Sequence, residues 1–468
     1  MEKIKFCGLL FIGGILSLVS SCLRDNDVEV DDWALGNALI ASFSLSSDSV
    51  AGLADVKFTI DQLNGKIYNK DSMRYGTVLK DKVLAAITFE SLVSEVLIVE
   101  QATGDTVKTI TDSINFSAPV MMTVKAYDGV STKVYEAKLN IHQVNPDTMV
   151  WEKYADILTG RTFQDMKTLV YNDACAMYVV EDGVCQLYRS GMQDMTYWEK
   201  FDLSGFPDKA LLSQMTVFED ALFVVTEAGD LYVSSDGQEW VLSPFGLSVK
   251  ALLGYLPAST VTGRSSVLCC LVEDEGVMRF VAVDRQMAYV LGKEAPEAFP
   301  VSGFGHLNYE TRYFPRLALA SGRDSRDNLS DMAWATMDGL SWASLSNSQK
   351  TFTAREGAAV FYYDGCFFVV GGMDAAGNAL DDIYFSTDQG VSWYGKVWVK
   401  NEDEGGDEYI QRGYYLMPGD CEARGFASAL VDKNNYILLF GGKAKKDTNV
   451  LNEIWRGRIN RLGFGKEN

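Results

Sequence analysis

Between Leu319 and Trp455 one arrangement of apolar and polar positions occurs three times. Each copy has an apolar run that stops at small residues, a polar loop, a second run that alternates with a period of two, and a turn that ends in an aromatic residue. Glycine lets the backbone leave a strand, and the alternation indicates that a strand resumes after the loop. Each copy is therefore predicted to be a β-hairpin with a long connection; the copies are 319–342, 369–393 and 438–455.

Repeats of about 40 to 50 residues, each a small sheet that cannot bury both faces alone, are typical of a β-propeller. Three weaker copies of the same arrangement come earlier in the chain, at 175–198, 221–240 and 266–291. The last copy lacks an outer strand, but residues 151–154 repeat the Trp-Glu-Lys-aromatic pattern of 198–201. We therefore expect a six-bladed propeller over residues 146–468, closed by a strand near 149–155 that removes an exposed edge.

Residues 33–145 are predicted to form a separate β domain, whose last hairpin turns at Asp128-Gly129. This hairpin resembles the final hairpin of immunoglobulin-like or cadherin-like β-sandwiches. A Cys-Trp-Cys core is lacking, which excludes the antibody type. The predicted fold class is all-β, an N-terminal β-sandwich followed by a six-bladed β-propeller. The expected strands of the sandwich are 38–45, 56–60, 83–89, 96–99, 121–127 and 133–141.

The double glycines at 371–372 and 441–442 resemble those of kelch-type propellers of the galactose oxidase class, and Arg355 and Arg424 precede them in similar Ala-Arg contexts. Residues 386–393 resemble the Asp-box turn of sialidase-like propellers, with shorter versions at 234–240 and 336–342. In such a turn the aspartate accepts backbone N–H bonds and the tryptophan packs between blades, which implies a structural role. The residues concerned are Asp236, Trp240, Asp338, Trp342, Asp388 and Trp393.

The N-terminus has the pattern of an export signal. Two lysines precede an apolar run from Phe6 to Val19, and Ser20-Ser21-Cys22 follows. Residues 1–21 thus resemble a lipoprotein signal peptide, with Cys22 as the lipid attachment site and 22–32 as an acidic tether. The alternative is a transmembrane helix, but the run is shorter than the ~20 residues that a span needs.

The whole layout resembles families of Gram-negative surface lipoproteins. That resemblance implies a protein held at the outer membrane or cell surface by its lipid anchor, and it implies no particular chemistry. Without residues 1–21 the chain has 42 − 2 = 40 basic and 63 − 1 = 62 acidic side chains, a net charge near −22. Nucleic acid is therefore not an expected partner, because phosphate contacts need clustered Lys and Arg.

The shortage of histidine limits the chemistry, since His142 and His306 are the only two. A galactose oxidase-type copper site needs two histidines, and the propeller has His306 alone. A zinc site and Ser/His/Asp catalysis are disfavoured by the same shortage, because His306 is more readily explained as a hydrogen-bonded strand residue. We therefore expect no metal, no cofactor and no catalytic residue. The spacing of the cysteines beyond Cys22 favours free thiols over disulfides.

Long loops at about 323–331, 373–381 and 443–451, together with the acidic connection at 398–422, build up one half of one propeller face. Such a face is the expected binding surface. The two arginines lie 371 − 355 = 16 and 441 − 424 = 17 residues before their glycine pairs, and counting back similarly from Ser321 reaches His306. Arginine suits a carboxylate or sulfate, although inter-blade salt bridges are the alternative role for both residues.

Binding of a glycan or a surface protein without catalysis is the favoured function. A glycan-active hydrolase or lyase with a sialidase-like site at the channel mouth remains the alternative. The predicted ligand-binding residues are His306, Arg355, Tyr409, Arg412, Tyr414, Tyr415 and Arg424.

Overall fold

The computed structural model describes residues 35–79, 82–107, 110–346, 350–395, 397–400, 409–412 and 415–464, with the backbone alone for 397–400 and 409–412. The chain divides between Asn145 and Pro146 into two compact units. Apart from three one-turn 3-10 segments, η1 (Leu53–Asp55), η2 (Leu212–Gln214) and η3 (Asn460–Gly463), the elements are strands. The predicted all-β class is therefore confirmed. Within the described ranges, no helix has the length and apolar character needed to cross a bilayer.

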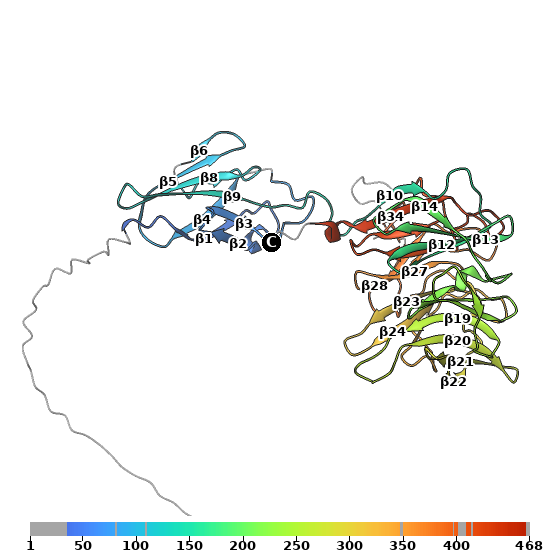
Figure 1. The fold of residues 1–468 in the computed structure, drawn as a ribbon. Coiled ribbons are helices and arrows are strands. Elements are labelled where there is room, and N and C mark those ends of the chain that lie inside the picture. The colour runs from blue at the N-terminus through green and yellow to red at the C-terminus, as the bar shows by residue number, and fades with distance from the viewer. Residues whose placement is uncertain are drawn as a thin grey trace, which may run out of the picture. The chain divides into compact units, whose positions relative to one another are not determined.

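Two sheets of the first unit share one hydrophobic core (Figure 1). Strands β4 and β8 bury every second residue, as period-two alternation requires when one face is covered. The three-stranded sheet has the order β1 (Ile40–Ser46), β4 (Val83–Phe89), β7 (Ser113–Ile114). The six-stranded sheet has the order β2 (Phe58–Asp61), β3 (Lys66–Asn69), β9 (Thr132–Lys138), β8 (Val120–Ala126), β5 (Val93–Glu100), β6 (Thr106–Val107), and β3 pairs with β9 in parallel.

In the described part of the second unit, six sheets follow one another along the chain, besides a hairpin of β30 (Val397–Lys400) and β31 (Tyr409–Arg412). The first three sheets are β11 (Asp165–Tyr171), β12 (Ala174–Glu181), β13 (Val184–Gly191), β14 (Asp194–Phe201); β15 (Thr216–Phe218), β16 (Ala221–Val225), β17 (Leu231–Ser234), β18 (Val241–Leu242); and β19 (Val249–Leu256), β20 (Val267–Asp274), β21 (Val277–Val283), β22 (Tyr289–Glu294). The next two are β23 (Gly305–Glu310), β24 (Pro315–Ala320), β25 (Ala333–Thr336), β26 (Ala343–Ser344); and β27 (Ala359–Tyr363), β28 (Cys366–Val370), β29 (Ile383–Ser386).

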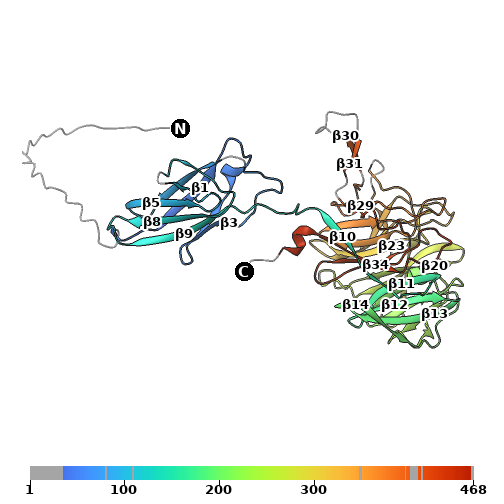
Figure 2. The same ribbon diagram turned by 90° about the horizontal axis from the view of Figure 1, so that it is seen from above.

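The last sheet combines both ends of the unit (Figures 1 and 2). It contains β32 (Ser428–Val431), β33 (Ile437–Phe440) and β34 (Glu453–Ile459), and β10 (Met149–Asp156) lies beside β34 as the fourth strand. The strand expected near 149–155 corresponds to β10. Its buried Trp151 packs on Gly457, where an added Cβ would lie 2.5 Å from the indole ring.

Each of the last three sheets leaves its second strand through a residue with left-handed backbone, namely Ser321 (φ 63°), Gly371 (φ 60°) and Gly441 (φ 56°). A Cβ on Gly371 would lie 2.3 Å from the backbone oxygen of Arg424, which belongs to the next sheet. Glycine is therefore required at this position both for its backbone conformation and for the close approach of two sheets.

Candidate functional site

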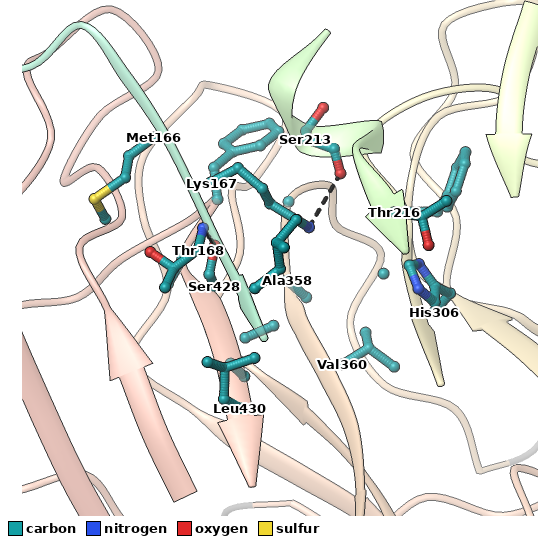
Figure 3. Close-up of a pocket in the computed structure, with 18 of the residues that line it drawn as sticks. Met166, Lys167, Thr168, Ser213, Thr216, His306, Ala358, Val360, Ser428 and Leu430 are labelled. Atoms are coloured by element: carbon teal, nitrogen blue, oxygen red, sulfur yellow. Dashed lines mark hydrogen bonds between the residues drawn. The ribbon is translucent and has the colours of Figure 1, made fainter. Parts of the chain in front are cut away.

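The first strands of the six sheets surround a cavity of about 320 Å³ (Figure 3). Its walls come from β11, β15, β19, β23, β27 and β32 and from the residues just before some of them. Pockets of this size hold a small ligand. The polar side chains that line the cavity are Asp165, Lys167, Thr168, Ser213, Thr216, Tyr255, His306 and Ser428.

Lys167 extends from β11 toward Ser213 along the wall of the cavity (Figure 3). Its Nζ donates a hydrogen bond to the backbone oxygen of Ser213 at 3.3 Å. No carboxylate within the described ranges forms an ion pair with this ammonium group. Because protein surrounds the cavity, water solvates the charge poorly, and burial lowers the pKa of Lys167 to about 8 against the opposing effect of Asp165.

His306, on β23, also lines the cavity (Figure 3). Its ring rests against Gly254, where an added Cβ would lie 3.0 Å from Cδ2. Burial, together with the smaller effect of the Lys167 charge, lowers the pKa of His306 to about 4. The imidazole is therefore neutral at pH 7, and it offers one hydrogen-bond donor and one acceptor.

Among the described residues that line the cavity, Asp165 is the only carboxylate. It lies two residues before Lys167 on β11, so the two side chains leave the strand on the same side. Burial raises the pKa of Asp165, while the charges of Lys443 and Lys167 act in the opposite direction. The cavity thus holds a cation and a carboxylate that are close enough to interact but do not form a direct ion pair.

The structure places Arg355 and Arg424 inside their own sheets and not among the lining residues of the cavity. Arg355 is completely buried, and its guanidinium donates to both carboxylate oxygens of Asp382, which directly precedes β29 of the same sheet. Arg424 is buried as well and donates to Glu453 of β34 at 2.6 Å. These contacts correct both roles considered for the arginines, because the side chains are neither open to a ligand nor paired between sheets.

Counting back from Ser321 predicted that His306 occupies the position in its sheet that Arg355 and Arg424 occupy in theirs, and this prediction was wrong. Ser302, Glu356 and Gly425 occupy equivalent places, because each forms a bridge to the second residue after the left-handed turn of its own sheet. The equivalent of the arginines is therefore Val301, and His306 lies 306 − 301 = 5 residues further along the strand. Counting residues back from Ser321 gave the wrong position because the first hairpin of this sheet is longer than that of the next sheet. Strands β23 and β24 have six residues each and are joined by residues 311–314, whereas β27 and β28 have five each and are joined by residues 364–365.

Of the remaining predicted ligand residues, Tyr415 has a described side chain, and it is not among the residues that line the cavity. Tyr414 lies outside the described residues, and the side chains of Tyr409 and Arg412 do as well; their backbone belongs to β31, in a hairpin that stands away from the six sheets (Figure 2). Tyr415 is half-buried, with its ring 5.3 Å from that of Phe368 and 5.1 Å from that of Phe385. Its contacts are those of a core residue.

An ionic bridge across three sheets is made by residues that were not predicted. Glu356 Oε1 accepts from Arg323 Nη2 at 2.8 Å and from Lys446 Nζ at 2.9 Å, and the three residues come from three successive sheets. Burial acts to raise the pKa of Glu356, but the two cations hold it below its ordinary value. Through Glu356 this bridge joins two of the long loops, those that contain Arg323 and Lys446.

Backbone hydrogen bonds also connect these sheets at the wall of the cavity. Phe426 N–H donates to the oxygen of Gly357, and Gly357 N–H donates to the oxygen of Gly303, both at 2.6 Å. All three residues line the cavity and have left-handed backbone. The wall is thus held by contacts between sheets and does not depend on flexible loops.

The three Ser/Thr-x-Asp turns share one hydrogen-bond pattern. In the first, Asp236 Oδ1 accepts from Gln238 N–H at 2.8 Å and from Glu239 N–H at 2.9 Å. Asp338 and Asp388 accept backbone N–H bonds in the corresponding turns. Burial acts to raise the pKa of each carboxylate, but the backbone donors hold it below its ordinary value. The tryptophans that end the turns, Trp240, Trp342 and Trp393, are buried in clusters that include residues of the preceding sheet.

The lining residues can bind a polar ligand more readily than they can catalyse hydrolysis of a glycan. Glycoside hydrolysis generally uses two carboxylates that flank the bond, and the described lining of the cavity supplies one, Asp165. Within the described ranges, no group of three or more His, Cys, Asp or Glu side chains could hold a metal ion. The six cysteines described there are free thiols.

Two family models match the chain. The model described as the DUF6242 beta propeller domain matches residues 145–467, and the model described as the DUF6242 N-terminal domain, a domain of unknown function, matches residues 39–139. The chain belongs to the DUF6242 family. The second unit is therefore a β-propeller domain, which confirms that part of the predicted fold.

A solved structure described as "Structure of YjhT" is similar to this DUF6242 protein over 64% of this chain and 95% of that chain. The sequence identity is 12% and the TM-score is 0.42. No curated protein matches the chain.

Proposed function

We propose that this DUF6242 protein is a lipid-anchored protein of the cell envelope that binds a glycan, without catalysis, in the cavity of its propeller. The observation that supports binding is the cavity itself, which is about 320 Å³ and combines hydroxyl groups with Lys167 and His306. Sugar hydroxyls need closely placed donors and acceptors of this kind. In this proposal each of the six sheets is one blade, and the first unit is a β-sandwich.

A glycan-active enzyme is the second candidate. It would use Asp165, whose pKa is raised by burial as the pKa of a general acid must be. The lining residues that the structure describes offer no second carboxylate, so binding without catalysis is better supported. In this proposal the ionic bridge around Glu356 stabilises the loops near the ligand site. Arg355 and Arg424 do not contact the ligand.

Blocking the cavity tests the binding proposal. Ser213 lines the cavity and is exposed, so Ser213→Trp can narrow it without removing core contacts. On a glycan array with residues 23–468, which contain every described residue, we expect this variant to lose the signals given by the unsubstituted protein. Ser344→Trp, at an exposed position of the outermost strand β26, is the matched control and should keep them. Equal binding by both variants would place the glycan site elsewhere.

Cys22→Ala tests the proposed anchor. Without the thiol that receives the lipid, we expect the protein to lose acylation and to leave the membrane fraction. Radiolabelled palmitate and membrane fractionation measure the two effects. Cys7→Ala, inside the signal segment, is the matched control and should leave both unchanged. Recovery of the Cys22 variant in membranes in the wild-type amount would contradict the anchor.

A further inference from the structure

We infer that the cavity selects a ligand that carries a carboxylate beside hydroxyl groups, that is, a sugar acid, and that Lys167 binds the carboxylate. This inference rests on the proposed function, and it adds the chemical class of the ligand. It depends on what surrounds the ammonium group of Lys167 and on which polar groups share the cavity with it.

Among the residues that the structure describes, Lys167 has no ion-pair partner, and its half-buried side chain lines the cavity. Its one described hydrogen bond goes to a backbone carbonyl oxygen at 3.3 Å, which leaves two of its three N–H donors for another group. Other cations of the unit differ in this respect: Arg323 and Lys446 pair with Glu356, and Arg355 pairs with Asp382. A poorly solvated ammonium without a counter-ion is costly, and a bound carboxylate would supply the missing charge.

The neighbouring groups suit the rest of a sugar acid. His306 is neutral and can donate one hydrogen bond to a carboxylate or accept one from a hydroxyl. Thr216 and Ser213 add hydroxyl groups to the lining of the same cavity (Figure 3). Asp165 can accept hydrogen bonds from ligand hydroxyls but would repel a second anionic group. The set therefore favours one negative charge with hydroxyls close to it.

Binding should be coupled to uptake of a proton. In the empty cavity burial holds the pKa of Lys167 near 8, and a bound carboxylate favours the charged form and raises that pKa again. Above pH 8 the ligand must therefore bind together with a proton, and affinity should fall as the pH rises through this range. The other titratable groups that line the cavity are Asp165, Tyr255 and His306, and Lys443 acts on Asp165 from outside the lining set.

The test uses residues 23–468 with three probes: galacturonate, glucuronate and the neutral methyl ester of galacturonate. Isothermal titration calorimetry at pH 6.5 and pH 8.5, in two buffers of different ionisation enthalpy, measures affinity and proton uptake together. We expect a uronate to bind with little proton uptake at pH 6.5 and with most of one proton at pH 8.5. The methyl ester should bind more weakly, without this uptake.

Substitutions at Lys167 separate charge from packing. Lys167→Met should weaken uronate binding roughly 10- to 100-fold, the size expected for loss of a hydrogen bond to a charged group. Lys167→Arg should keep most of the affinity and lose the proton uptake, because arginine stays charged. Lys250→Met removes the same charge from an exposed position paired with Glu273 and should change neither quantity. Thermal unfolding of each variant shows whether it is folded.

The outcomes distinguish this inference from the proposed function. If the ester binds as tightly as the uronates and Lys167→Met has no effect, but Ser213→Trp abolishes binding, the cavity binds glycans and the inference about the acid group is wrong. If neither uronate binds at millimolar concentration, the inference is also overturned, and the glycan array then decides whether the cavity binds neutral sugars. Uronate binding without proton uptake at pH 8.5 would exclude Lys167 as the residue that meets the carboxylate.

Discussion

Replacing Arg355 by alanine is expected to lower the free energy of unfolding of the propeller by about 3–5 kcal/mol, because it leaves a carboxylate without its partner in a mostly buried site. The guanidinium is completely buried and donates two hydrogen bonds to Asp382, one at 2.9 Å to the backbone oxygen of Gly371 and one at 2.7 Å to that of Thr353. Loss of this side chain therefore removes both the ion pair with Asp382 and the hydrogen bond to the left-handed turn at Gly371. Urea unfolding followed by tryptophan fluorescence measures the change, since eight of the nine tryptophans lie after residue 146.

Arg326→Ala is the control for this experiment. Arg326 pairs with Glu297 in an exposed position, where ion pairs contribute little, and its loss should cost less than about 1 kcal/mol. Arg355→Lys should fall between the two, since lysine keeps the charge but cannot form the paired hydrogen bonds. An Arg355→Ala variant that unfolds at the wild-type urea concentration would show that the ion pair is dispensable.

Replacing Trp151 by alanine is expected to lower the free energy of unfolding by about 3–5 kcal/mol, the usual cost of removing a buried aromatic side chain. Trp151 fixes β10 to β34 by packing on Gly457, and its loss also weakens the only cover of the β34 edge. We expect aggregation at a lower temperature in addition to the lower stability. Differential scanning calorimetry and light scattering measure the two effects.

Tyr197→Ala provides a matched aromatic substitution. Tyr197 lies on β14, the outermost strand of another sheet, and its side chain is 73% exposed. Its replacement should change the stability by no more than about 0.5 kcal/mol. If both variants unfold alike, β10 does not hold the ring closed.

The repeat pattern predicted those strands whose ends are marked by glycine turns and whose residues alternate clearly. It did not predict β11, which supplies Asp165 and Lys167, because that strand lacks a clean alternation. An innermost strand lies between two neighbouring sheets, and both of its sides are largely covered. Its polar residues face the cavity or a neighbouring sheet, so their burial depends on residues far away in the sequence. The charged pair Asp165 and Lys167 within an otherwise apolar run was the signal that could have revealed the site.

Residue type and spacing predicted the region of Arg355 but not its role. Its partner Asp382 lies beyond the left-handed turn and a loop, 382 − 355 = 27 residues later, and no local pattern connects them. Likewise, the position of His306 depended on the length of one hairpin, which spacing from Ser321 could not reveal. In the first unit, the hairpin at Asp128-Gly129 was predicted correctly, with β8 and β9 on either side. The short strands β6 and β7 were not, since two residues are too few to show alternation.

The pairing of β10 with β34 also determines when the protein can finish folding. Met149 and Ile459 are partners although 459 − 149 = 310 residues separate them. Because the chain is synthesised from its N-terminus, β10 is made early and stays unpaired until β34 has been synthesised. Contacts between such distant residues form slowly, and an incomplete chain keeps two open strand edges that invite aggregation or proteolysis. Only a chain that extends through Ile459 can complete this sheet, so the same pairing that stabilises the propeller also distinguishes chains that contain β34 from those truncated before it.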